Sequence, residues 1–228
     1  LDARGIHWCW DSGLHVPMII WYPKGIEAPQ QIAPGRVDDQ VYSLLDIAAT
    51  TLWIAGIPKP FGMQSRVFLG SNLDSPRSYA FAARDRIDET QVRLRSVHDN
   101  RYHYIRNFTP GAGFQTLNRY KEKCFLVKPL MRDLYAEGKL SGPPADLMKP
   151  FPNEMLYDTY SDPHEINNIV DSKNQEHQDA LNRLRAALDT WMVSTNDRGH
   201  IPEPQELVDE FSKEMHDWFG TPDWVQEK

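Results

Sequence analysis

The sequence predicts a mixed α/β fold: a strand and a helix of an α/β sheet layer, followed by a small α+β subdomain. Residues 16–23 form a continuous apolar run closed by proline, which is typical of a strand buried on both faces. Residues 79–83, 92–97 and 102–106 are short, rich in β-branched and aromatic residues and separated by polar turns, which predicts an antiparallel sheet. Residues 174–194 carry one apolar stripe at helical spacing, which predicts a C-terminal helix covering that sheet.

The strand and helix predicted in the first part of the chain need further strands to form a sheet. Residues 41–57 have apolar side chains at helical spacing and predict a helix with one buried face, ended by Gly56 and Pro58. One strand and one helix leave backbone edges exposed and build no core. We therefore expect the other strands of this layer to come from residues before Leu1 or from another chain.

The remaining segments fill in the subdomain. Residues 98–101 predict a hairpin turn, and residues 155–158 a further strand. Residues 117–140 have a helical pattern that breaks near Pro129. The tail, residues 204–228, has apolar spacing that predicts a docking helix or an interface element.

Three regions follow from these elements. Residues 1–76 are expected to form the terminal strand–helix portion of a larger domain, residues 77–201 the α+β subdomain, and residues 202–228 the tail.

Composition limits the partners. The 228 residues carry a formal net charge of −7, which argues against nucleic-acid binding, because phosphate contacts need a basic face. No apolar run approaches the length of a membrane span, so we expect no membrane partner. The cysteines, Cys9 and Cys124, have no metal-ligand spacing, and a disulfide between them stays open.

Several segments, in order, resemble the C-terminal region of the type I sulfatases of the alkaline-phosphatase-like superfamily. Residues 11–20 (DSGLHVPMII) resemble the family's acidic-x-Gly-x-basic-x-Pro segment, and residues 101–105 (RYHYI) its Arg-Tyr-Lys-Tyr-Ile strand. Residues 156–169 (LYDTYSDPHEINNI) resemble its Leu-Tyr-Asp…Asp-Pro-x-Glu-x-x-Asn-Leu signature. Residues 84–89 (RDRIDE) resemble the branch that includes heparan N-sulfatase. The resemblance implies that residues 1–76 are the terminal strand–helix portion of the catalytic domain and end its alkaline-phosphatase-like sheet layer.

The resemblance also implies a reaction. Family sulfatases hydrolyse sulfuric esters or sulfamates with a formylglycine made within a Cys/Ser-x-Pro-x-Arg motif, assisted by calcium. Sulfuryl transfer needs a strong nucleophile and positive charge on the non-bridging oxygens. The implied substrate is a sulfated glycan, and the implied location is periplasmic, secreted or lysosomal.

The nucleophile motif is not found in this sequence. Cys9 is followed by Trp10, and Cys124 by Phe125, so neither fits the motif. We therefore expect no catalytic nucleophile and no calcium ligand in this chain, and we expect both in a missing N-terminal half. The family's sulfate-binding Lys position, five residues before Asp11, is Ile6 here.

Four residues are candidate substrate contacts: His15, Arg84, Asp85 and Arg86. His15 follows the segment that starts at Asp11, and active sites of open sheets gather at strand ends. A hydrogen-bonded strand-end histidine explains it equally well. The three others follow a predicted strand, where a loop with arginines would clamp anionic groups of a sugar. A surface salt-bridge cluster is the alternative, and we prefer it for Arg86.

Two functions are compatible with these observations. The first is a sulfatase whose C-terminal portion is this chain, inactive by itself. The second is a truncated or degenerate sulfatase-like module that binds or supports without turnover, which Ile6 favours. A phosphatase of the same superfamily fits the later motifs less well.

Overall fold

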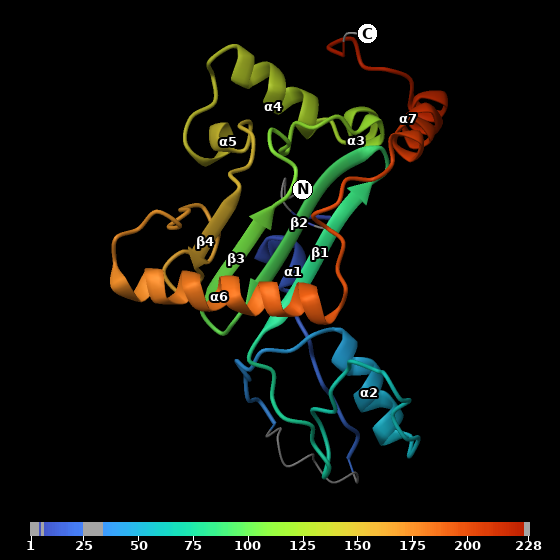
Figure 1. The fold of residues 1–228 in the computed structure, drawn as a ribbon, viewed down its shortest axis with the longest axis vertical. Helices are drawn as coiled ribbons and strands as arrows, with labels where there is room; N and C mark the ends of the chain where they lie inside the picture. Colours follow the sequence, from blue (N-terminus) through green and yellow to red (C-terminus); the bar gives the residue numbers. More distant parts are fainter. Residues whose placement is uncertain (1–4, 6, 25–33, 226–228) are drawn as a thin grey trace.

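A computed structural model describes Gly5 and residues 7–24 and 34–225 (Figure 1). At its centre is a four-stranded antiparallel sheet in the order β1-β2-β3-β4. The strands are β1 (Ala80–Ile87), β2 (Thr90–His98), β3 (Tyr102–Asn107) and β4 (Glu154–Asp158). The predicted antiparallel sheet and its hairpin turn at residues 98–101 are confirmed.

Helix α6 (Gln175–Ser194) covers one face of the sheet, as predicted (Figure 1). Its buried side chains, Ala180, Leu181, Leu184 and Leu188, pack on Val97, Tyr102, Tyr104 and Leu156 from three strands. Trp191 stacks on Phe81 with ring centroids 5.2 Å apart. The apolar stripe therefore predicted both the helix and its buried face correctly, because that face packs its apolar side chains against one face of the sheet.

The opposite face of the sheet is covered by the N-terminal segment, which includes the short helix α1 (Asp11–Leu14) (Figure 1). Trp8, Cys9 and Trp10 are buried there against Leu94 and Ile105. The Trp10 indole donates to the Tyr157 hydroxyl at 3.3 Å. Residues 7–14 thus run across the sheet face that α6 leaves open.

Four helices lie beyond one end of the sheet, and α2 (Leu45–Ile54) lies beyond the other end (Figure 1). The four are α3 (Arg119–Cys124), α4 (Val127–Ala136), α5 (Pro143–Asp146) and α7 (Gln205–Phe219). The predicted break in residues 117–140 lies at residues 125–126, and Pro129 sits in the first turn of α4, where proline is tolerated. Helix α7 packs on α3 through Tyr120 and Phe219, so the tail docks on its own chain.

The predicted strand at residues 16–23 is wrong. This segment forms no β-ladder with the described residues, and Ile19 and Trp21 are 91% and 79% exposed. A lone strand has no hydrogen-bond partner for its backbone, so apolar character alone does not make it a strand. Trp21 is therefore not a core residue in this structure.

Helix α2 (Leu45–Ile54) confirms the predicted helix, but its buried face was predicted wrongly. The buried residues are Asp46, Ala49 and Thr50, whereas Leu44 and Leu45 are exposed. The helix ends at Ile54, and Gly56, which was predicted to stop it, follows the C-cap residue with a φ of +70°, which favours glycine. The amphipathic pattern was real, but its apolar side faces away from the described chain.

Residues 84–89 are also placed differently from the prediction. They were expected to form a loop after a strand, but β1 continues to Ile87 and only Asp88 and Glu89 make the turn to β2. The register shifts between Arg84 and Arg86, where an irregularity interrupts the β1–β2 ladder. The prediction took the run of charged residues as evidence for a loop. Charged side chains also occur on strands, where they face solvent or pair with neighbouring groups.

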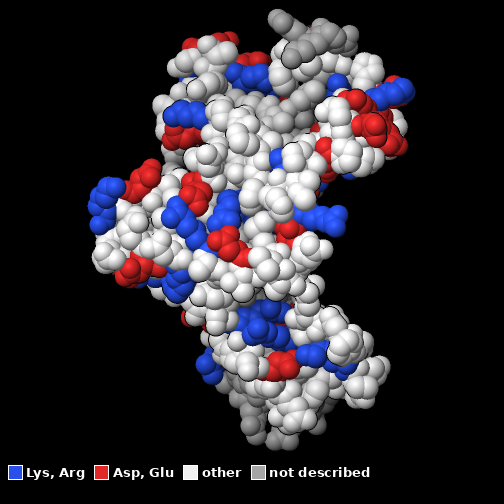
Figure 2. Space-filling model, in the orientation of Figure 1, with Lys and Arg blue, Asp and Glu red and all other residues white. Residues whose placement is uncertain are grey.

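Acidic and basic side chains are interspersed over the α6 face (Figure 2). No helix among residues 7–24 and 34–225 combines the length and apolar character that a bilayer span requires. Cys9 is buried and Cys124 exposed, and both are free thiols.

Replacing Asn174 by Ala is expected to lower the free energy of unfolding by about 1 kcal/mol. Asn174 caps α6, and its side-chain oxygen accepts from the backbone N–H of Glu176 at 2.9 Å. Urea unfolding measures the change. Asn182→Ala, at an exposed position inside the same helix, is the matched control and should not destabilise. An equal loss in both variants would show that the cap contributes nothing.

Candidate functional site

The four predicted site residues do not form one group. His15 is exposed at the end of α1, with Nδ1 3.7 Å from Oδ2 of Asp11. Asp85 pairs with Arg95 at 2.8 Å, and Arg86 pairs with Glu203 and lies over the Phe211 ring. Arg84 alone is buried, and it points to the sheet face that carries the N-terminal segment.

Arg84 belongs to a group that we call the Trp8 cluster: His7, Trp8, Arg84 and Lys121. The Arg84 guanidinium lies over the Trp8 ring at 4.1 Å, and the Lys121 ammonium lies 5.6 Å from the same ring. Arg84 donates to the backbone carbonyls of Val92 and His7, at 3.1 and 2.6 Å. Within residues 7–24 and 34–225, neither cation has a carboxylate within ion-pair distance.

Burial is the main cause of the lowered pKa values in the Trp8 cluster, and the charge of Asp88 only partly offsets it. Burial lowers the pKa of Arg84 to about 10. Burial and the nearby Arg84 lower the pKa of Lys121, and burial, Lys121 and Arg84 lower that of His7. Each positive charge here disfavours the next, so the cluster is suited to an anion.

Two further features of the cluster point the same way. The buried indole N–H of Trp8 has no hydrogen-bond acceptor among the described residues. The backbone of His7 has a φ of +92°, a conformation that is strained for a residue with a side chain. Strained backbone and unsatisfied buried donors concentrate at binding sites, because the surrounding fold holds them there for a ligand.

Other charged hollows are less suited to an anion. Basic side chains gather between α6 and α2 (Figure 2), in a region where Arg77, Arg101 and Arg183 line a hollow. All three arginines are already paired with carboxylates, namely those of Asp46, Asp158 and Asp99 respectively. A second hollow, beside α7, is lined by four carboxylates and one arginine, which would repel a sulfated ligand.

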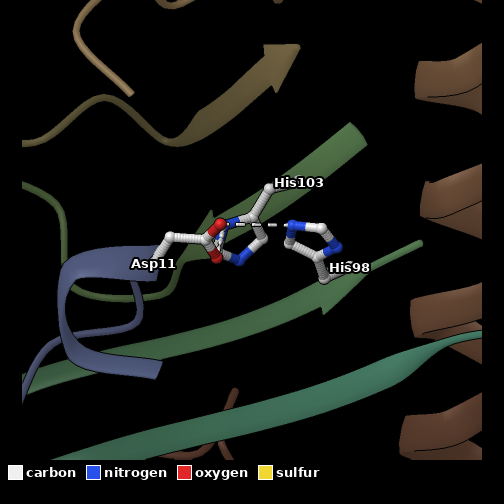
Figure 3. A group of neighbouring side chains, drawn as sticks. All are labelled: Asp11, His98 and His103. Carbon is white, nitrogen blue, oxygen red and sulfur yellow. Dashed lines mark ion pairs between the residues drawn. The ribbon is translucent and has the colours of Figure 1, made fainter. Parts of the chain in front are cut away.

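A second group lies on the same sheet face, at the hairpin end of β2 and β3 (Figure 3). We call it the Asp11 cluster: Asp11, His98, His103 and Glu165. His98 Nε2 lies 3.4 Å from Asp11 Oδ2, and His103 Nδ1 lies 3.6 Å from Asp11 Oδ1. His103 Nδ1 also donates to Glu165 Oε1 at 2.5 Å. Glu165 Oε2 accepts from the backbone N–H of Asp11 at 2.7 Å, at the start of α1.

Backbone register explains why the two histidines meet. His98 and His103 are directly opposite in the β2–β3 pair, and opposite residues of an antiparallel pair share a face. Their ring centroids are 5.0 Å apart. Burial acts to raise the pKa of Asp11, but His98, His103 and His15 outweigh it and lower that pKa. Burial opposes charge on His98 too, yet pairing with Asp11 raises its pKa.

Sequence reasoning missed both clusters as units. It placed His98 in a hairpin turn and His103 in the strand that follows, and it gave neither histidine nor Lys121 a role in binding. The family-like segments could have pointed to the Asp11 cluster, because three of them contribute to it. Residues 11–20 contain Asp11, residues 101–105 contain His103, and residues 156–169 contain Glu165. Three segments far apart in sequence meet at one cluster, which only a three-dimensional structure reveals.

The prediction that Ile6 replaces the family's sulfate-binding lysine cannot be compared with the structure, because Ile6 lies outside the described residues.

The calcium that the resemblance implies can be compared with the Asp11 cluster. Calcium takes oxygen ligands, whereas the Asp11 cluster presents two imidazoles, so this cluster does not fit the calcium that the resemblance implies.

Comparison with known proteins finds two sulfatases that are similar to this chain in sequence. The chain is 39% identical over 201 residues to an ulvan-active sulfatase of Formosa agariphila, a match that spans 87% of this chain and 32% of that protein. A second ulvan-active sulfatase of the same organism is 27% identical over 194 residues, with 82% of this chain and 34% of that protein covered. No protein-family model matches the chain.

A solved 2-O GAG sulfatase superposes on 67% of this chain and 25% of its own, with a TM-score of 0.42 and 18% identity. That likeness is too low to add to the sequence relationship. The chain spans about a third of the length of the curated relatives it matches. The chain is therefore homologous to part of two sulfatases.

Proposed function

We propose that this chain is the C-terminal part of a sulfatase that hydrolyses sulfuric esters of a sulfated glycan. The observation that carries the proposal is the 39% identity to an ulvan-active sulfatase, which extends over 87% of the chain. The Trp8 cluster supports it, because two cations that have no carboxylate partner among the described residues suit a sulfate group.

Exposed apolar side chains support the proposal that this chain is only part of the sulfatase. Large hydrophobic side chains around α2 and residues 16–21 are exposed, among them Val16, Ile19, Trp21, Leu44, Leu45, Ile54 and Phe61. Soluble chains rarely leave so many neighbouring apolar side chains in water. We propose that the N-terminal half of the sulfatase covers them.

The proposed chemistry divides between the two halves. A formylglycine nucleophile and calcium would be held by residues outside this chain, and calcium would supply positive charge to the sulfate oxygens. Lys121 and Arg84 would hold an anionic group of the substrate, with Arg84 fixed by its two carbonyl acceptors. The strained His7 turn would set the approach of the substrate to Trp8.

The substrate class follows from the relatives' names. Both are ulvan-active, so we propose a sulfate ester on an ulvan-like polysaccharide. The resemblance of residues 84–89 to the heparan N-sulfatase branch would instead favour a sulfamate. The second candidate function, a module without turnover, is favoured by Ile6 at the sulfate-binding position.

The test uses the complete gene product. It is incubated with ulvan, with heparan sulfate and with chemically desulfated ulvan, and released inorganic sulfate is measured by ion chromatography. We expect release from ulvan only. Release from heparan sulfate alone would replace the ester by a sulfamate. A folded protein that binds ulvan without releasing sulfate would support the non-catalytic module.

A further inference from the structure

The Asp11 cluster has the protonation pattern of a metal site. His98 Nδ1 is hydrogen-bonded to the backbone carbonyl of Asp99, and His103 Nδ1 to the Glu165 carboxylate. A carbonyl and an ionised carboxylate only accept, so both Nδ1 atoms carry the proton. A neutral imidazole protonated at Nδ1 has its lone pair at Nε2, which is the atom left to bind a metal.

The two Nε2 atoms are poorly satisfied without a metal. His103 is fully buried, and its Nε2 has no hydrogen-bond partner in the described chain. His98 Nε2 lies 3.4 Å from Asp11 Oδ2, beyond the usual distance of a charge-assisted hydrogen bond. That separation matches two ligand atoms of one tetrahedral ion, which lie roughly 3.4 Å apart when each bond is about 2.1 Å.

The charges also need balancing. Asp11 and Glu165 are half-buried and buried carboxylates, and the described ion pairs of Asp11 are with histidines alone. When both imidazoles bind a metal as neutral ligands, Asp11 leaves one half-buried negative charge on this sheet face. Buried charge is costly without compensation, and one divalent cation supplies it.

We propose that Asp11, His98 and His103 bind a zinc ion. Ligand atoms from all three residues lie within 4.8 Å of one another. Two imidazoles and a carboxylate suit zinc, whereas calcium and magnesium prefer oxygen ligands. Glu165 orients His103 from behind, as carboxylates do for metal-bound histidines. His15, whose Nδ1 is 3.7 Å from Asp11 Oδ2, or a water molecule completes the coordination.

A zinc ion at this site would join the N-terminal segment to the sheet. Asp11 begins α1 in the N-terminal segment, whereas His98 and His103 belong to β2 and β3 (Figure 3). One ion bound by all three fixes the segment that carries Trp8 against the sheet. This inference does not depend on the proposed hydrolysis, because zinc binding and sulfate release are measured separately.

Calorimetry tests the proposal. The purified protein is stripped of metal with a chelator, dialysed, and titrated with zinc chloride and, separately, with calcium chloride. We expect one zinc ion bound per chain, no heat from calcium at the same concentrations, and a higher melting temperature with zinc. Cobalt substitution should give the intense visible bands of a tetrahedral site.

Variants assign the ligands. His98→Gln, at a partly exposed position, should abolish zinc binding while circular dichroism stays unchanged. Glu165→Gln should weaken zinc affinity about 10–100-fold, as expected for a residue that orients a ligand. His216→Gln, an exposed histidine on α7, is the matched control and should bind zinc normally. Zinc binding that survives His98→Gln, or a folded wild-type protein that binds no zinc, would overturn the proposal.

Discussion

Replacing Lys121 by Met in the complete protein is expected to lower kcat/KM for the sulfated glycan about 100-fold, the scale of losing one charged donor at a reacting or bound anion. The Lys121 ammonium makes no hydrogen bond or ion pair with the described residues and lies 5.6 Å from the Trp8 ring. Methionine keeps the apolar stem beside Trp8, so the substitution removes charge with little change in packing.

Lys123 provides the matched control. It is an exposed lysine on the same helix, α3, and Lys123→Met should leave kcat/KM within twofold of wild type, since distant exposed charges are screened. Initial rates at several glycan concentrations measure both variants. Equal rates for wild type and Lys121→Met would remove the Trp8 cluster from substrate binding.

Replacing Asp46 by Ala is expected to lower the free energy of unfolding by about 3–5 kcal/mol, the scale of breaking a buried ion pair. Asp46 is 1% exposed and accepts two hydrogen bonds from Arg77, at 2.6 and 2.5 Å. It also accepts from the backbone N–H groups of Arg66 and Ser43. The carboxylate therefore ties α2 to two later segments, and alanine leaves a guanidinium and two N–H groups unsatisfied.

Urea unfolding checks this prediction, with Asp39→Ala as the exposed control that should change stability by less than about 0.5 kcal/mol. Burial acts to raise the pKa of Asp46, but the bonds from Arg77, Arg66 and Ser43 outweigh it and hold the pKa below 3.8. A lowered folded-state pKa stabilises above the unfolded value and ceases to do so as pH falls through the folded value. The gap between wild type and Asp46→Ala should therefore shrink below about pH 4. A gap that stays constant to pH 2 would contradict the ion-pair explanation.

The sequence predicted the elements that carry their own periodic signal. The strands β1 to β4 and the helix α6 were found because their apolar side chains pack against one another and against the N-terminal segment within this chain. The strand at residues 16–23 failed for the opposite reason: its apolar side chains have no partners in the described chain. Helix α2 was found, but its buried face is set by Asp46 and its partners, which an apolar pattern does not encode.

The candidate sites were less accessible from sequence. Arg84 was predicted as a substrate contact on a loop, whereas the structure places it buried in β1. Its neighbour Lys121 comes from α3, which follows β2 and β3 in the chain, so the sequence did not bring the two residues together. The Asp11 cluster joins residues separated by up to 154 positions. Pairing His98 with His103 needs the exact β2–β3 register, which a single sequence does not fix.

The most direct test of the central claim is the initial rate of inorganic sulfate release from ulvan, measured for wild type, Lys121→Met and Lys123→Met in one series. A sulfatase that uses the Trp8 cluster should release sulfate as wild type and as Lys123→Met, and should lose about 100-fold in kcat/KM as Lys121→Met. No release by any folded protein, or the same rate from all three, would contradict the account.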